Sequence, residues 1–390
     1  MTGLTLSINQ SNKVYRIAVG CLFFMQGLTF ATWASRIPSI QQSLHLSDAA
    51  LGLALFALPV GSMLALPLSS WLIGRLGSKI VAINALLLYS LLLITLGLAS
   101  SITQLVLGLV LFGMAGNFAN IAINTQAVGV ETKYGRNIMA SFHGLWSLAG
   151  FTAAGIGAFT ISRNIAPFAH FLFIISAIYL GMAVVFHFLL PDGKSKTAGS
   201  SSRFFEKPDK TLLTLGLIAF CVMICEGAMF DWSGIYFQKV VGAEKGWIGA
   251  GYTAFMCTMA AGRFIADHVA RRIGFKKTVQ FSGFLIATGL GISVVFPYLF
   301  TAILGFLLVG FGVSSVVPLV YSEAGKSQIR SASAALAVVS SIGFLGFLIG
   351  PPLIGVVAGL FSLKMSFVII AIMGMCVALM ASRFRRPALN

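Results

Sequence analysis

The chain is built from a series of about twelve apolar runs, each close to the length that crosses a lipid bilayer. A helix needs about 20 apolar residues to cross a hydrocarbon core about 30 Å thick. A β-barrel would instead alternate apolar and polar residues over segments of about ten, whereas these runs are continuous. The sequence therefore predicts an all-α membrane protein with twelve transmembrane helices. The predicted spans are residues 15–36, 50–73, 79–99, 103–129, 138–161, 166–190, 211–238, 247–266, 277–296, 298–320, 330–359 and 361–382.

The composition excludes a soluble fold, because only 9% of the 390 residues are charged and 58% are hydrophobic, whereas about a quarter of a soluble domain is charged. The charges are also unbalanced, with 26 Lys and Arg against 10 Asp and Glu. In a soluble protein this excess would suggest a nucleic-acid partner. Here the basic residues cluster between the apolar runs, where the positive-inside rule accounts for them. We therefore expect a lipid bilayer, and no nucleic acid, as partner.

The distribution of Lys and Arg predicts the orientation of the chain. Of the 26 basic residues, 21 fall on one side of the predicted spans. The five on the opposite side are Arg36, Arg163, Lys239, Lys245 and Lys364. Since positive residues stay on the cytoplasmic side, both termini and the segment 191–210 are predicted to be cytoplasmic.

A single long polar stretch divides the chain near its middle. Residues 191–210 are rich in Ser, Gly and charge, which is typical of a linker. The sequence thus predicts an N-terminal six-helix bundle at 1–190, a cytoplasmic linker at 191–210 and a C-terminal six-helix bundle at 211–390. The two halves also resemble each other, since Gln26-Gly27 in the first span has a counterpart in Glu226-Gly227 in the seventh. We therefore expect two pseudo-symmetric bundles.

Three stretches carry a family signature. The first is Gly262-Arg263-Phe264-Ile265-Ala266-Asp267, followed by Arg271-Arg272-Ile273-Gly274-Phe275-Lys276-Lys277. It resembles the cytoplasmic loop motif of the major facilitator superfamily. The second, Ser70 to Lys79 between the second and third spans, resembles the same motif with Gly74 in place of the family's aspartate. The third, Gly346 to Gly355, is similar to a glycine-proline pattern of many members of this superfamily.

Further stretches are similar to a bacterial inner-membrane branch related to fucose permeases. They are Trp33 to Pro38, Asn124 to Ala127 before Glu131, and Glu226-Gly227 before Asp231-Trp232-Ser233. The resemblance implies a monomeric secondary carrier in the bacterial inner membrane. It also implies a central cavity lined by helices one, four, five, seven, ten and eleven. Duplicated halves of this kind bind their substrate at a shared interface and give alternating access by rocking against each other.

Charged residues near the predicted cytoplasmic loops are candidates for gating. Asp267 is followed by Arg271 and Arg272, and charge pairs there can hold helices together in one state and release them in the other. The alternative is that Asp267 only offsets nearby cations at the lipid headgroups. The other gating candidates are Arg75 and Arg263 in the two loop motifs, and Glu131 and Glu323 with the arginines that follow them, Arg136 and Arg330.

Glu226 is the leading candidate for a proton-coupling group. It lies past the middle of the seventh predicted span, where an ionisable residue costs about 2.5–3.5 kcal/mol and is a functional suspect. A desolvated carboxyl favours its protonated form and can exchange a proton, as a proton-coupled carrier requires. The alternative is a carboxyl permanently paired with a neighbouring helix. Asp231 is a second candidate, either in an external gate with Arg36 or in an ordinary interfacial ion pair.

Polar and aromatic side chains within the spans suggest a binding surface. Asn117, Asn120 and Asn124 share one face of the fourth predicted span. Amides suit neutral, hydroxyl-rich solutes, although they also hydrogen-bond between helices as packing groups. The remaining candidates are His143 for proton coupling and Gln26, Trp33, Trp146 and Trp232 for substrate binding.

The sequence favours a transporter over an enzyme, because it lacks a Walker loop, an HExxH motif and a nucleophile elbow. We expect no catalytic residues, no cofactor and no metal site. The prediction is proton-coupled uptake of a small neutral polar solute, such as a sugar. One alternative is a proton-antiporting exporter of lipophilic compounds. The other is a non-transporting receptor or lipid scramblase on the same fold.

Overall fold

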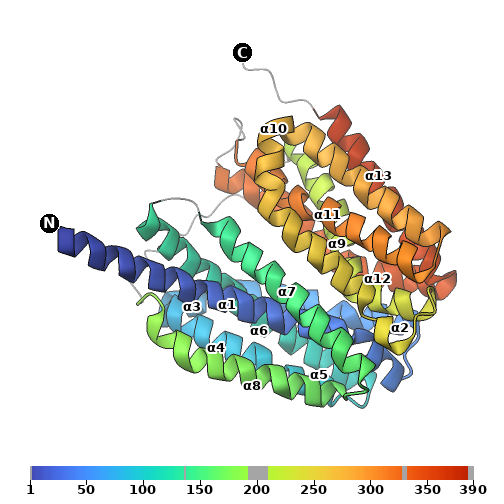
Figure 1. The fold of residues 1–390 in the computed structure, drawn as a ribbon, viewed down its shortest axis with the longest axis horizontal. Helices are drawn as coiled ribbons and strands as arrows, with labels where there is room; N and C mark the ends of the chain where they lie inside the picture. Colours follow the sequence, from blue (N-terminus) through green and yellow to red (C-terminus); the bar gives the residue numbers. More distant parts are fainter. Residues whose placement is uncertain (1, 136–137, 192–209, 327–331, 385–390) are drawn as a thin grey trace. The chain divides into compact units, whose positions relative to one another are not determined.

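A computed structural model describes residues 2–135, 138–191, 210–326 and 332–384 of the chain. Within these residues the regular structure is entirely helical (Figure 1). The helices are α1 (Thr2–Ser43), α2 (Asp48–Leu55), α3 (Ala57–Leu76), α4 (Ser78–Leu91), α5 (Leu93–Gly97), α6 (Ile102–Tyr134), α7 (Met139–Ser162), α8 (Pro167–Val185), α9 (Lys210–Lys239), α10 (Ala250–Val295), α11 (Leu299–Ala324), α12 (Ala332–Leu360) and α13 (Leu363–Arg383), with short 3-10 turns at Phe186–Phe188 and Lys245–Trp247.

Counted over the described residues, eleven helices are long and apolar enough to cross a membrane. The predicted span at 247–266 is not among them as a separate helix. It forms the first part of α10, which is interrupted at Gly274 by non-helical backbone angles. Hence α10 contains both the eighth and the ninth predicted spans. The prediction of an all-α membrane fold is confirmed.

The chain forms two compact units. Unit 1 comprises Met1–Leu44 and Ala57–Ala198, and unit 2 comprises His45–Phe56 and Gly199–Asn390. Most of the linker predicted at 191–210 lies outside the described residues, so the domain boundaries stay a prediction. The two units are considered separately below.

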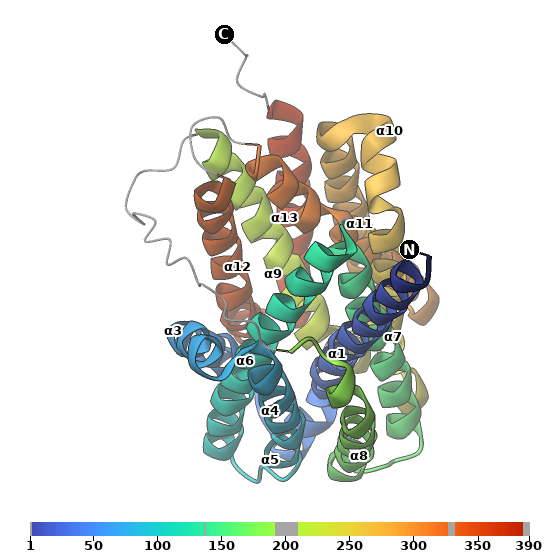
Figure 2. The ribbon, with the colours of Figure 1, turned by 90° about the vertical axis from the view of Figure 1, so that its left-hand side faces the viewer.

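In unit 1, glycines let helices meet backbone to backbone. Helix α1 lies beside α7 in both views (Figure 1, Figure 2), and a Cβ on Gly27 would lie 2.5 Å from the carbonyl oxygen of Trp146. Helix α3 packs against α6, where a Cβ on Gly113 would collide with the carbonyl oxygen of Leu58. Such close approach is typical of membrane helices, whose association depends on van der Waals packing.

Unit 2 repeats this scheme. Helix α9 packs against α12, where a Cβ on Gly346 would collide with the carbonyl oxygen of Phe220. The first part of α10 packs against α11, where a Cβ on Gly310 would collide with the carbonyl oxygen of Phe255. The predicted pseudo-symmetry is therefore visible in the packing of each unit.

A constant spacing relates α3, α4 and α6 in unit 1 to α10 and α11 in unit 2. Gly310 follows Gly113 by 197 positions, and its contact Phe255 follows Leu58 by the same number. Two turn glycines keep this spacing and share their backbone angles. Gly77 has φ 86° and ψ 156°, and Gly274 has φ 83° and ψ 161°. Only glycine adopts this region without strain, so each unit turns its chain at the same place.

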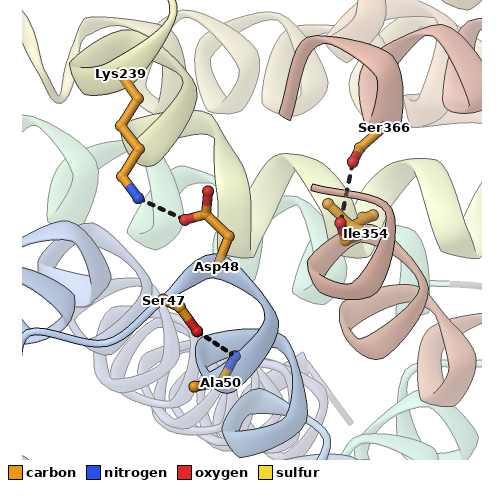
Figure 3. A network of polar contacts seen from close by, with 6 residues as sticks. All are labelled: Ser47, Asp48, Ala50, Lys239, Ile354 and Ser366. Atoms are coloured by element: carbon orange, nitrogen blue, oxygen red, sulfur yellow. Dashed lines mark hydrogen bonds and ion pairs between the residues drawn. The ribbon is translucent and has the colours of Figure 1, made fainter. Parts of the chain in front are cut away.

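Helix α2 packs within unit 2, although it precedes α3 of unit 1 in the chain. Ser47 caps the helix by accepting a backbone N–H of its first turn at 3.2 Å, and Asp48 pairs with Nζ of Lys239 at 2.6 Å (Figure 3). Gly52 lies against Gly355 so closely that a Cβ on either residue would be 2.7 Å from a Cα atom of the other. The start of the second predicted span is therefore fixed on α12 and α9.

Candidate functional site

An ion pair between α9 and α10 forms the centre of the candidate site. Nη2 of Arg263 lies 3.2 Å from Oε1 of Glu226. The side chains are 19% and 14% exposed respectively, so the pair is largely buried but not sealed. Cys225, the residue before Glu226 on α9, and Met259, one turn before Arg263 on α10, are fully buried.

The pair lies near the middle of both helices. Glu226 stands 13 residues before Lys239 at the end of α9, and Arg263 stands 13 residues after Ala250 at the start of α10. At about 1.5 Å per residue, each is about 20 Å from those ends. The sequence places Arg263 near the cytoplasmic end of the eighth predicted span. The structure corrects this, because Arg263 lies near the middle of the helix. The helix continues past the predicted boundary until Gly274.

Two charges at this depth are costly to separate. Removing one member of a buried ion pair leaves an uncompensated charge and costs about 3–5 kcal/mol. An arginine stays protonated in proteins, whereas a carboxyl can take up a proton. Of the two groups, Glu226 is therefore the one whose charge can change.

Unit 1 carries a similar sequence element without the charges. Gly27, beside Gln26, lies against Trp146 of α7, where a Cβ would be 2.5 Å from the carbonyl oxygen, whereas Gly227, beside Glu226, lies against the ring of Phe347 of α12, where a Cβ would be 3.4 Å away. Glu226 follows Gln26 by 200 positions, whereas the spacing of 197 makes Leu66 the counterpart of Arg263. Unit 1 therefore has an apolar residue where unit 2 has Arg263.

The amide face predicted on the fourth span is present on α6. Asn117 accepts a hydrogen bond from Oγ of Ser69 at 3.0 Å, so this amide links α6 to α3. Nδ2 of Asn124 donates to the side-chain oxygen of Asn120 at 2.9 Å. Asn120 and Asn124 line an open hollow of about 470 Å³, together with Ile121, Thr125 and Val128. One of the three amides therefore packs helices, while the other two line an accessible hollow that is otherwise mostly apolar.

The aromatic candidates of unit 1 divide between packing and surface. Trp146 stacks on Phe30 with 5.9 Å between ring centroids, and the exposed His143 meets Phe23 edge-on at 5.3 Å. Gln26 is buried. Trp33 is also fully buried and packs near Phe112.

Trp232, the aromatic candidate of unit 2, is fully buried as well. Neither it nor Trp33 presents a ring face to a solute in this conformation. A role of either tryptophan in binding stays a prediction.

The two residues predicted to form an external gate have different settings. Arg36 is 1% exposed, and its guanidinium donates to Oγ1 of Thr160 at 3.4 Å and to the carbonyl of Ile165. These contacts tie the end of α1 to α7 and the segment after it, within unit 1. Asp231 is half-buried on α9 in unit 2. Their pairing stays a prediction.

Glu131 caps the start of α7. Its Oε2 accepts the backbone N–H groups of Ile138 and Met139 at 2.8 and 2.9 Å. A carboxylate at a helix N-terminus satisfies donors that lack a partner inside the helix and interacts well with the helix dipole. The residue predicted to act in gating thus has a defined structural contact, which joins α6 to α7.

Glu131→Ala is expected to lower the free energy of unfolding by about 1–2 kcal/mol, because two backbone donors lose their acceptor. Both N–H groups donate to one oxygen, so Glu131→Gln keeps an acceptor for both but loses the negative charge at the helix N-terminus, and is expected to lose about half as much. Unfolding of the detergent-purified protein measures both effects. Glu244→Gln, which changes an exposed glutamate, is the control. Equal stability of Glu131→Ala and the wild type would contradict the capping role.

The remaining gating candidates lie near helix ends. Glu323 is buried and accepts from Nζ of Lys326 at 3.3 Å. By the spacing of 197 it corresponds to Gln126 rather than to Glu131. Arg75 is exposed and stacks over Trp71 at 4.8 Å. Arg136 and Arg330 lie outside the described residues.

The loop-motif residues before Gly274 also need a revised alignment. Arg271 and Arg272 are exposed. Gly77 and Gly274 are equivalent turn glycines, so Gly74, three residues before Gly77, corresponds to Arg271, three residues before Gly274. In the family motif this position holds an aspartate. Asp267 lies four residues before it, which is about one helical turn. The side chain of Asp267 lies outside the described part of the structure.

Gln126 is a residue whose contacts the sequence reading missed. Its amide nitrogen donates to Oγ of Ser78 at 2.8 Å and to the carbonyl of Leu190 at 3.2 Å, and its oxygen accepts the N–H of Leu190 at 3.1 Å. It therefore joins α6 to the start of α4 and to the segment after α8. The available signal was a further amide in the same mostly apolar helix, two residues after Asn124.

Comparison with known proteins identifies relatives over most of the chain. The family model described as Major Facilitator Superfamily matches residues 19–329. An uncharacterised MFS-type transporter of Yersinia pestis is 32% identical over 375 residues, which cover 95% of this chain and 96% of the relative. The cis,cis-muconate transport protein of Acinetobacter baylyi is 24% identical over 328 residues, covering 77% and 76%. A crystal structure of a variant of the nucleoside transporter NupG is similar in fold, with a TM-score of 0.77 at 12% identity, covering 94% of this chain and 99% of that one.

Proposed function

We propose that this chain, which belongs to the major facilitator superfamily, is a proton-coupled secondary carrier of a small polar solute. Transport by a multi-pass membrane protein is the property of the family, and it agrees with the resemblance read from the loop motifs. Proton coupling, with Glu226 as the group that takes the proton, is our proposal.

The ion pair of Glu226 and Arg263 is the observation that carries the proposal. An ionisable residue deep within a membrane protein is expensive and marks a transport pathway or proton relay in many cases. When Glu226 takes a proton, its attraction to Arg263 falls and the pair can open. When the proton leaves, the pair forms again. One proton thereby switches a contact between two helices.

A polar solute is supported by features of unit 1. The hollow on α6 presents Asn120 and Asn124, whose amides donate and accept hydrogen bonds without charge. A relative with 24% identity is named as a cis,cis-muconate transport protein.

We further propose that the chain acts as a monomer in a bacterial inner membrane, with both termini in the cytoplasm. The distribution of basic residues supports this orientation, because 20 of the 26 fall on the side of the termini once Arg263 is counted as lying within its span.

Glu226→Gln is expected to abolish solute-driven proton movement, because the amide cannot take up a proton. Proteoliposomes of the full chain with an internal pH-sensitive dye would be given fucose, glucose, uridine, benzoate and lactate in turn. The wild type is expected to move protons with at least one of them, and Glu226→Gln is expected to move none. Glu244→Gln, an exposed glutamate of the same unit, is the control. Full proton movement in Glu226→Gln would contradict the proposal.

A further inference from the structure

A hollow of about 330 Å³ lies between the start of α9 and the end of α13 in unit 2. The two helices pack against each other (Figure 2), and each is long and apolar enough to cross a membrane, over Lys210–Lys239 and Leu363–Arg383. The hollow therefore lies where spanning helices leave the hydrocarbon core and meet the lipid headgroups. Its lining residues are Lys210, Thr211, Thr214, Met380, Arg383 and Phe384.

Each helix lines the hollow with one of its faces. On α9, Lys210 and Thr211 precede Thr214 by four and three positions, and on α13 Met380 precedes Arg383 by three. Residues at these spacings are neighbours on a helix surface. The hollow thus receives one cation from each helix, together with two hydroxyl groups from α9.

Phe384 holds the end of α13 in place. It is buried, and its ring meets the ring of Phe275 on α10 edge-on, with 5.2 Å between the centroids. Arg383, the residue before it, is exposed. The arginine therefore stands on an anchored helix end while its side chain stays accessible.

The lining carries two positive charges and no acidic side chain. Lys210 and Arg383 are both exposed, and neither forms an ion pair with another described residue. The hydroxyl of Thr214 donates to the carbonyl of Lys210 at 2.7 Å, whereas the hydroxyl of Thr211 makes no hydrogen bond to a described residue and can donate to a ligand. Asp209, which precedes Lys210 in the chain, lies outside the described residues. The lining therefore suits an anion with several acceptor oxygens.

Exposed apolar side chains continue from the hollow along both helices. Leu213 and Leu217 follow Lys210 by three and seven positions, and Leu379 precedes Arg383 by four, so each lies on the same side of its helix as the cation. A soluble anion would contact the hollow alone. An anion with apolar chains would also cover these leucines.

We infer that the hollow binds the phosphate of an anionic membrane phospholipid, whose acyl chains lie along the exposed leucines of α9 and α13. Arginine binds phosphate through two parallel hydrogen bonds, and lysine binds it as a point charge. Basic pockets between spanning helices are typical sites for anionic headgroups. A zwitterionic headgroup fits less well, because its own cation would lie near two others. This inference is independent of proton coupling.

The test compares lipids and phosphates on the full chain, purified in detergent and washed free of lipid. Phosphatidylglycerol and phosphatidylcholine with the same ten-carbon chains, glycerol 3-phosphate and inorganic phosphate would each be titrated. Native mass spectrometry gives the Kd of bound molecules, and the melting temperature gives a second readout. We expect phosphatidylglycerol to bind most tightly. The two soluble phosphates are expected to bind at least about tenfold more weakly, because they bury no acyl chain.

Lys210→Gln/Arg383→Gln is expected to weaken the binding of phosphatidylglycerol by about thirtyfold, because each cation near an anionic lipid contributes about fivefold. Thr211→Val is expected to weaken it by about fivefold through the loss of one donor. The matched control is Lys276→Gln/Lys277→Gln, which removes two exposed lysines of the same unit. The altered side chains are exposed or half-buried, and the melting temperature without lipid verifies that each variant folds.

Three results would overturn the inference. Equal binding of phosphatidylglycerol by the two double variants would show a general effect of charge. Equal binding of phosphatidylcholine and phosphatidylglycerol would show that the acyl chains alone select the site. Inorganic phosphate that binds as tightly as phosphatidylglycerol would identify a soluble phosphate as the occupant.

Discussion

Replacing Arg263 with methionine is expected to lower the free energy of unfolding by about 3–5 kcal/mol, because it leaves the Glu226 carboxyl buried without its partner. The double variant Glu226→Gln/Arg263→Met is expected to recover most of this loss. Replacing both charges with well-packed neutral groups is often nearly neutral in buried pairs. Unfolding in mixed micelles of detergent and sodium dodecyl sulfate measures the three proteins on one scale.

The control for this pair is Arg163→Met, which removes an exposed arginine in unit 1. Surface changes of this kind usually stay within about 0.5 kcal/mol. A double variant as unstable as Arg263→Met would contradict the ion pair, because the loss would then come from the packing of the arginine stem. The decisive measurement is therefore the stability that the double variant regains, and not the stability that Arg263→Met loses.

The fold could be predicted because a bilayer imposes a length on apolar helices. About 20 apolar residues per crossing set the spans almost independently of tertiary contacts. The depth of Arg263 could not be predicted in the same way. The apolar run ends near residue 266, but the helix continues through Arg271 and Arg272, whose long side chains tolerate a helix end near the headgroups. The helix ends at Gly274, where the backbone has φ 83°.

The contacts of the polar residues were harder to predict than their presence. Gln126 binds Leu190, which is 64 positions away in the chain. Glu131 caps the next helix by bonding to Ile138 and Met139. Amides and carboxyls in apolar runs must find partners, but a sequence does not say which helix supplies them. Glu131, which the sequence suggested for gating, therefore caps α7, and hydrophobic periodicity does not predict this contact.

A short stretch is similar in the two units, Gln26-Gly27 in unit 1 and Glu226-Gly227 in unit 2. Both glycines lie against an aromatic residue of another helix, Trp146 in unit 1 and Phe347 in unit 2. The two contacts differ, because a Cβ on Gly27 would collide with the carbonyl oxygen of Trp146, whereas one on Gly227 would only touch the ring of Phe347. The likeness indicates a shared origin of the halves, and the two units diverge in how these residues pack.

Gly113→Ala is expected to destabilise the chain by about 1–3 kcal/mol, because its Cβ would collide with the backbone oxygen of Leu58 and force α6 away from α3. Gly310→Ala is expected to do the same in unit 2 against Phe255. Matched controls are Gly155→Ala and Gly291→Ala, whose Cβ atoms would meet nothing within 4 Å. These are expected to gain up to about 1 kcal/mol, since alanine favours a helix over glycine. Unfolding of the four variants in mixed micelles gives the comparison.

If Gly113→Ala and Gly155→Ala changed stability equally, the backbone contact between α3 and α6 would be refuted. The pseudo-symmetry of the packing predicts further that Gly113→Ala and Gly310→Ala lose similar amounts, because the same contact recurs 197 positions later.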